Sequence, residues 1–153
     1  MILATLAYLK KDGKTLMMHR IKKDRDVHQG KWNGLGGKMH AGETPEECVI
    51  REIREEAGLE AINPKLRGVL TFPDFDGKQD WYAFLYTVTE FSGRLSKDCP
   101  EGHLEWIDDA KLQSLPLWEG DYQFLKWLED GKNFSAKFVY VNKKLTDSKV
   151  VFW

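Results

Sequence analysis

Residues 37–59 read GKMHAGETPEECVIREIREEAGL, and this stretch predicts a helix whose two ends are both marked. Thr44 is a favourable N-cap residue, and Glu47, three residues later, completes a capping box. Pro45 suits the first helical position, where its missing N–H leaves no hydrogen bond unmade. Gly58 is placed to end the helix in a left-handed turn. We therefore expect the helix to begin at Pro45 and to end just before Gly58.

The helix predicted over Pro45–Ala57 has two distinct faces. At about 100° per residue, its larger apolar side chains share one arc about a quarter-turn wide. Such an arc is the stripe that a surface helix buries against a core. The apolar arc consists of Val49, Ile50, Ile53 and Ala57, and beside it lies an acidic arc of Glu52, Glu55 and Glu56.

The acidic arc places three carboxylates at positions i, i+3 and i+4 of one helix. Like charges at this spacing destabilise a helix by about 0.2–0.5 kcal/mol per pair. A sequence that keeps them therefore gains from binding a cation, and hard oxygen ligands of this kind favour Mg²⁺ or Mn²⁺. The alternative is a solvated acidic face on an ordinary surface helix, which three glutamates alone do not exclude.

The segment Gly34–Lys38 precedes the helix and is predicted to form a flexible, glycine-rich turn. Glycine adopts positive φ and lets the backbone approach a ligand closely. A glycine cluster alone is also typical of an ordinary tight turn. Because this one leads directly into the acidic helix, we expect the two together to bind a metal ion and a polyphosphate.

The spacing within residues 37–59 resembles the Nudix box, G-x5-E-x7-R-E-U-x-E-E-x-G-U with U aliphatic, at every fixed position. Resemblance to the Nudix family implies an α/β/α sandwich of the α+β class, in which helices cover a mixed β-sheet, in a single domain over residues 1–153. It also implies hydrolysis of a nucleoside diphosphate linked to a further group, with Mg²⁺ as the cofactor or Mn²⁺ in its place.

The same resemblance assigns roles to individual side chains. The metal ligands that it implies are Glu52, Glu55, Glu56, Glu101 and the carbonyl group of Gly36. The catalytic residues that it implies are Arg51, Glu55, Glu56 and Glu101. Arg51 is expected to hold the carboxylates by ion pairing and Glu43 to support the loop, while the general base stays open among Glu55, Glu56 and Glu101. For Glu101, the alternative is a surface position in the turn Cys99–Gly102.

The likeness extends to the MutT-type 8-oxo-dGTP diphosphatases through residues 30–38, GKWNGLGGK. In that branch, an Asn at the position of Asn33 hydrogen-bonds the purine edge, for which an amide offers two donors and an acceptor. The alternative is a loop Asn that bonds its own turn. The substrate-binding residues that the resemblance implies are Asn33, Lys38, Phe72, Trp118 and Asp121.

One part of the resemblance carries a departure. Trp118 and Asp121 resemble a Trp-x-x-Asp element of the vertebrate oxidised-purine triphosphatase, which has paired Asp residues where this chain has Gly120 before Asp121. Most aromatic residues lie in protein cores, so Trp118 and Phe72 are equally compatible with core positions.

Length and composition limit the class of protein further. The 153 residues suffice for one domain with a proper core, and 23 Lys+Arg against 24 Asp+Glu argue against a broad nucleic-acid-binding surface. The two cysteines, Cys48 and Cys99, cannot form a disulfide framework and are typical of a reducing cytoplasm. Residues 1–9 lack the features of a targeting segment and are too short to span a bilayer. We expect a small nucleotide as partner, neither nucleic acid nor membrane, and a monomer or homodimer.

The remaining pattern predicts strands around one further helix. Asp12-Gly13 is a hairpin signal between two strands, and the charged residues 22–31 indicate a loop. Strands are predicted at residues 1–9, 15–19, 65–72, 81–89, 104–107, 136–141 and 150–153, and a helix at residues 120–130. The four histidines show no metal-ligand spacing, and we assign them no catalytic role.

The leading hypothesis is a Mg²⁺-dependent pyrophosphohydrolase that converts 8-oxo-dGTP, or related oxidised purine nucleoside triphosphates, to the monophosphate and pyrophosphate. One alternative is a Nudix hydrolase of ordinary nucleoside triphosphates or nucleotide sugars. A second alternative is a nucleotide-binding sensor without catalytic activity, although this chain keeps every acid of the motif.

Overall fold

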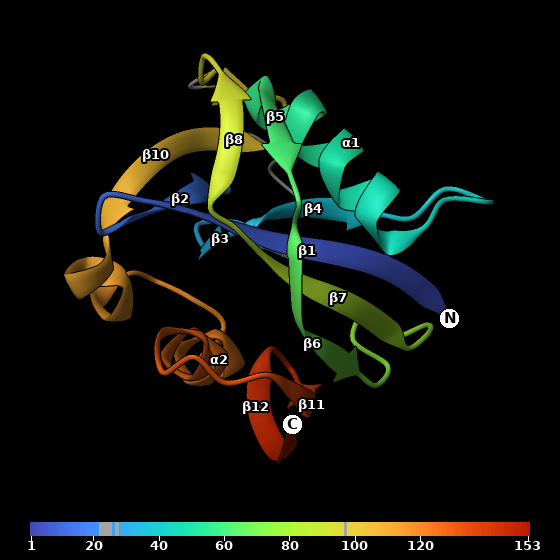
Figure 1. Cartoon of the computed structure of the whole chain (residues 1–153). Coiled ribbons are helices and arrows are strands. Elements are labelled where there is room, and N and C mark those ends of the chain that lie inside the picture. Colours follow the sequence, from blue (N-terminus) through green and yellow to red (C-terminus); the bar gives the residue numbers. More distant parts are fainter. Residues whose placement is uncertain (22–25, 27, 97) are drawn as a thin grey trace.

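The computed structural model describes residues 1–21, 26, 28–96 and 98–153 (Figure 1). The loop predicted over residues 22–31 lies partly outside these described residues, and its described part includes a turn at residues 28–30. Within the described chain, no helix is both long and apolar enough to cross a bilayer.

Ten strands of the described chain share one mixed sheet. They are β1 (Ile2–Lys11), β2 (Lys14–His19), β3 (Trp32–Asn33), β4 (Leu35–Lys38), β6 (Lys65–Phe72), β7 (Trp81–Val88), β9 (Asp98–Cys99), β10 (Gly102–Asp108), β11 (Phe134–Val141) and β12 (Lys144–Phe152). Their order is β12-β11-β6-β7-β1-β2-β10-β9, with β3 paired to β2 and β4 to β1. Strand β1 runs parallel to β7 and antiparallel to β4, so the sheet is mixed, as predicted.

The other elements are two α-helices, a short 3₁₀ helix and a second small sheet. They are α1 (Pro45–Ala57), α2 (Glu119–Glu129), η1 (Asp109–Ser114), and the pair β5 (Leu59–Ile62) and β8 (Glu90–Gly93). In Figure 1, α1 and α2 lie on opposite sides of the large sheet.

Helix α1 has the bounds that its sequence predicts. The Thr44 hydroxyl accepts a hydrogen bond from the Glu47 N–H at 3.1 Å, and the Thr44 N–H donates to the Glu47 carboxylate at 3.2 Å. At the other end, Gly58 has φ of 71°, and its N–H donates to the Arg54 carbonyl group. These caps satisfy backbone groups that a helix end otherwise leaves unpaired.

Alternation along β1 divides the core between the two faces of the sheet. Ala7 and Leu9 point into the cluster beneath α1, whereas Tyr8 points into the cluster beneath α2. From α1, the first cluster receives Val49, Ile53 and Ala57. From α2, the second cluster receives Phe124, Leu125 and Leu128. One strand therefore contributes to both layers of core, which is the α/β/α sandwich predicted from the sequence.

The prediction of a flexible turn over Gly34–Lys38 is wrong, because residues 35–38 form β4 and pair with β1. The glycines serve close packing of backbones. A Cβ on Gly36 would collide with the Thr5 carbonyl group, and a Cβ on Gly34 would lie 2.5 Å from the Ala7 carbonyl oxygen. The segment is thus held rigidly against the sheet.

Several strands differ from their predicted extents. The strand predicted at residues 150–153 belongs to a longer β12, Lys144–Phe152, which pairs with β11 along its length. Its first half is polar because β12 is an edge strand with largely exposed side chains. The short strands β3, β5, β8 and β9 were not predicted, since two to four residues carry too little periodicity to be recognised.

Candidate active site

One cleft of about 670 Å³ collects residues from distant parts of the chain. Its acid end, as we name it, comprises Gly36, Gly37, Glu52, Glu56 and Glu101. Its aromatic end comprises His28, Asn33, Phe72, Phe75, Trp118, Asp121 and Tyr140. Lys38 and Ala83 also line the cleft.

Glu56 is a buried carboxyl group at the acid end. Its side chain reaches β4, where the Gly36 N–H donates to Glu56 Oε1 at 2.8 Å, and the residue is only 8% exposed. Burial raises the pKa of Glu56 to about 8, and the nearby carboxylates of Glu52 and Glu101 raise it further. The sequence placed Glu56 beside the buried stripe, but packing of α1 on β4 buries it, whereas Ile50 of the predicted stripe is only partly buried.

Glu52 lies one turn earlier on α1 and presses against the backbone of β4. A Cβ on Gly37 would lie 2.6 Å from the Glu52 carboxyl carbon, so only glycine leaves room for this approach. Burial raises the pKa of Glu52, while its hydrogen bond to Arg51 opposes that rise. Glycine in β4 and glutamate in α1 therefore form one packed unit.

Arg51 joins the loop before α1 to the carboxylates of the helix. Its Nε donates to Glu43 Oε2 at 2.6 Å and its Nη2 to Glu43 Oε1 at 3.0 Å, a two-point ion pair. Its Nη1 donates to Glu52 at 2.8 Å and more weakly to Glu55 at 3.3 Å. The Glu43 carboxylate also accepts from the His40 N–H at 2.7 Å, and Arg51 lowers the pKa of Glu43 to about 2.

Two predicted residues differ in their relation to the cleft. The Glu55 side chain is 57% exposed, and Glu55 is not among the described residues that line the cleft. Glu101, in the turn between β9 and β10, lines the cleft together with Glu52 and Glu56. Lys38 lines it too, and its ammonium group lies 5.4 Å from the centre of the Trp81 ring.

The oxygen donors of the acid end suit a hard divalent cation. Glu52, Glu56 and Glu101 offer carboxylate oxygens beside the backbone of Gly36, the donor type that Mg²⁺ and Mn²⁺ prefer. Within the part of the chain that the structure describes, no three acid, His or Cys side chains already converge as a preformed metal site. Arg51 is one reason that these carboxylates do not converge, because it draws the Glu52 and Glu55 carboxylates toward its guanidinium group.

The aromatic end contains two buried polar groups, Asn33 Oδ1 and the Asp121 carboxyl group. Asn33 Oδ1 is buried without a hydrogen-bond partner among the described residues. Asp121 is 7% exposed, and burial raises its pKa to about 8, with Lys31 acting in the opposite direction. Asp121 is therefore protonated below about pH 8 and presents both a donor and an acceptor.

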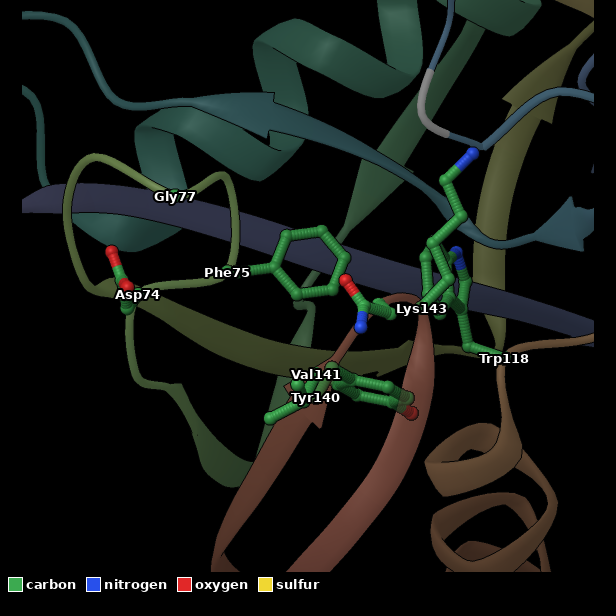
Figure 2. A pocket seen from close by; sticks show the side chains of 8 residues that line it. Asp74, Phe75, Gly77, Trp118, Tyr140, Val141 and Lys143 are labelled. Atoms are coloured by element: carbon green, nitrogen blue, oxygen red, sulfur yellow. The ribbon is translucent and has the colours of Figure 1, made fainter.

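Three aromatic rings contact one another edge-on beside these groups. The ring centres of Phe75, Trp118 and Tyr140 are 5.1–5.7 Å apart, with interplanar angles of 63–87°. Figure 2 shows these rings around a side pocket of about 270 Å³, which they share with the cleft. Phe72 also belongs to this wall, at 5.6 Å from Phe75.

Tyr140 explains why glycine stands at position 120. The Gly120 N–H donates to the Tyr140 hydroxyl at 2.8 Å. A Cβ on Gly120 would lie 2.8 Å from the Phe138 ring and 2.9 Å from that hydroxyl. The hairpin β11–β12 thus fills the space that a second acidic side chain would need, and Asp121 remains as the carboxyl group of this wall.

The structure also adds residues that the sequence did not single out: His28, Phe75 and Tyr140 line the cleft. Trp118 Nε1 donates to His28 Nδ1 at 2.8 Å. The histidine has no motif around it, and the two aromatic residues belong to a loop and a C-terminal strand far from the acidic helix. Only the three-dimensional arrangement reveals these three positions.

Comparison with known proteins identifies the class. The NUDIX domain model matches residues 3–128, most of the chain, and the protein therefore belongs to the Nudix family. It is 35% identical to an uncharacterized Nudix hydrolase of Bacillus subtilis over 131 residues, covering 84% of this chain and 79% of the relative.

Two further proteins are similar over most of the chain. The chain is 28% identical to the oxidized purine nucleoside triphosphate hydrolase of Danio rerio, over 90% of this chain and 86% of the relative. It is also similar to the crystal structure of a MutT protein from Bacillus halodurans, with a TM-score of 0.86, 31% identity, and coverage of 98% of this chain and 97% of the other.

Proposed function

We propose that this Nudix hydrolase converts 8-oxo-dGTP, or related oxidised purine nucleoside triphosphates, to the monophosphate and pyrophosphate. The observation that carries the proposal is that one cleft joins a carboxylate-rich end to an aromatic end, where the buried Asn33 Oδ1 has no partner among the described residues. A nucleotide has a charged chain at one side and a flat polar base at the other. The cleft matches both in one continuous space.

The acid end supplies the groups for phosphate chemistry. In our proposal, Glu52, Glu56, Glu101 and the Gly36 carbonyl group hold Mg²⁺, which when bound polarises phosphate oxygens and lowers the pKa of water. Arg51 keeps Glu52 oriented through its ion pairs with Glu43 and Glu52. We expect Lys38, which lines the cleft, to bind a phosphate oxygen.

The aromatic end supplies the groups for base recognition. Guanine presents an acceptor at N7, whereas 8-oxoguanine carries an N7–H donor beside a new carbonyl oxygen. An unpartnered acceptor such as Asn33 Oδ1 suits an N–H donor, and the protonated carboxyl group of Asp121 pairs with an edge that offers both. We expect Trp118 and Phe72, which line the cleft, to contact the flat face of the base.

A panel of nucleotides tests the proposal. Purified protein is incubated with 8-oxo-dGTP, dGTP, dATP and a nucleotide sugar, with Mg²⁺ or with EDTA, and the products are separated by chromatography. We expect release of pyrophosphate from 8-oxo-dGTP with the highest kcat/KM, and no turnover in EDTA. Equal or faster turnover of the nucleotide sugar would favour the broader Nudix alternative.

Failure to hydrolyse any nucleotide with Mg²⁺ or Mn²⁺, while nucleotides still bind, would favour a sensor.

We also propose a cytoplasmic location, because both cysteines are free and buried rather than joined in a disulfide.

A further inference from the structure

His28 lies at the aromatic end and packs against two of its rings. Its ring centre is 5.7 Å from that of Trp118, edge-on, and 6.0 Å from that of Phe75, nearly parallel. It lines the same cleft as Asn33 and Asp121. A polar ring thus occupies a place that packing alone could fill with an apolar one.

The hydrogen bond from Trp118 fixes which nitrogen of His28 carries the proton. An indole N–H only donates, so His28 Nδ1 must accept at 2.8 Å. Burial lowers the pKa of His28 to about 4, and Arg20 lowers it further, so the ring is neutral at pH 7. A neutral imidazole that accepts at Nδ1 carries its hydrogen on Nε2, which makes Nε2 a donor.

The backbone at His28 is anchored as well. The His28 backbone N–H donates to Asp26 Oδ1 at 3.1 Å, and Asp26 Oδ2 accepts from Arg20 Nε at 2.8 Å. Trp118 itself is only 5% exposed. None of the described residues accepts a hydrogen bond from His28 Nε2. The donor is therefore oriented in advance, which reduces the entropy lost when a ligand binds.

We propose that His28 is a specificity-determining residue whose Nε2–H donates to the carbonyl oxygen at C6 of the purine base. This rests on the proposed function and names its substrate class more narrowly: purines with an oxo group at the edge that meets His28. A purine that places an amino group there would set two donors against each other, and the pocket would lose a hydrogen bond. Asn33 and Asp121 complete the recognition of the remaining edge.

Two substitutions separate recognition from packing. His28→Phe keeps an aromatic ring but removes both nitrogen atoms, and His28→Gln keeps an acceptor for Trp118 and a donor for the base. We expect His28→Phe to raise KM for 8-oxo-dGTP roughly three- to tenfold, which is the effect of losing one net hydrogen bond. The kcat should change little. KM for dATP should change less than twofold, and His28→Gln should recover much of the loss for 8-oxo-dGTP.

A proportional rise in KM for both nucleotides, or no change for either, would show that His28 only packs and would overturn the inference. Calorimetric binding of 8-oxo-dGMP, dGMP and dAMP in EDTA makes the test independent of turnover. Wild type should bind the two oxo purines more tightly than dAMP, and His28→Phe should lose most of that difference. If the wild type binds all three monophosphates equally, or binds none of them, the inference is also overturned. If the wild type binds the two oxo purines more tightly than dAMP but hydrolyses no nucleotide, only the proposed function is refuted.

Discussion

The two ends of the cleft are built in different ways. The acid end comes mostly from one run of sequence, β4 and α1, and its Glu52 is held by Arg51, which also bonds Glu43 and Glu55. The aromatic end comes from the turn at His28, from β3, the end of β6, the loop after β6, the start of α2 and β11, and its buried Asn33 Oδ1 has no hydrogen-bond partner among the described residues. In our proposal, this difference means that the acid end carries out the chemistry and the aromatic end selects the substrate.

The largest expected effect comes from Glu56 at the acid end. Glu56→Gln keeps the shape of the side chain but removes a ligand charge, and we expect kcat to fall at least about a hundredfold, the scale at which single electrostatic groups act. The free energy of unfolding should not fall, because the substitution removes a buried acid whose pKa is raised to about 8. Steady-state kinetics and urea denaturation measure the two quantities.

The exposed Glu60, paired with Arg54 on the surface, provides the matched control. Glu60→Gln should leave kcat within about twofold, since exposed ion pairs contribute little. If Glu56→Gln retained more than a tenth of wild-type kcat, the assignment of the chemistry to the acid end would be wrong.

The two ends of the cleft also differ in how much of each could be predicted from the sequence. The helix, its caps and the acids Glu52 and Glu56 lie within 20 consecutive residues, where periodicity and spacing are readable. Rigid pairing of the glycine segment with β1 was missed because it depends on residues about 30 positions away. His28 and Tyr140 reach the aromatic end through tertiary contacts to Trp118 and to Gly120, and no local pattern encodes such contacts.

A second prediction concerns the ion pairs that orient the acid end. Arg51→Lys keeps the charge but cannot make the two-point contact with Glu43 and the contact with Glu52 together. We expect kcat to fall roughly tenfold with little change in KM for 8-oxo-dGTP. Arg54→Lys, on the exposed side of α1, is the control and should be nearly silent. A rise confined to KM would mean that Arg51 binds substrate rather than orienting the carboxylates.

At the aromatic end, removal of the Asn33 amide should affect binding and spare the chemical step. We expect Asn33→Ala to raise KM for 8-oxo-dGTP roughly five- to tenfold, as the loss of one or two hydrogen bonds predicts, with kcat within about threefold. Product inhibition by 8-oxo-dGMP should weaken in parallel. A fall in kcat as large as that of Glu56→Gln would show that the two ends are not separable.

The last expected effect is on stability and comes from Asp121. Its carboxyl group has a pKa of about 8 in the folded protein against an ordinary value of 3.8, because burial disfavours the charge. Below about pH 4 the group is protonated in both states, and its contribution to stability is fully present. As pH rises from about 4 to 8, the unfolded chain releases the proton while the folded protein keeps it, so stability falls across this window.

Asp121→Asn removes that titration, so its free energy of unfolding should exceed that of the wild type by about 1–3 kcal/mol at pH 7, and the difference should vanish near pH 4. Urea denaturation at pH 4, 5, 6, 7 and 8 measures it, with the exposed Asp130→Asn at the end of α2 as control. Parallel curves for Asp121→Asn and the wild type would mean that Asp121 is ionised in the folded state. Asp121 would then act on the base only as an acceptor, and the preference for an N–H donor on the purine would rest on two acceptors, Asn33 and Asp121, instead of one.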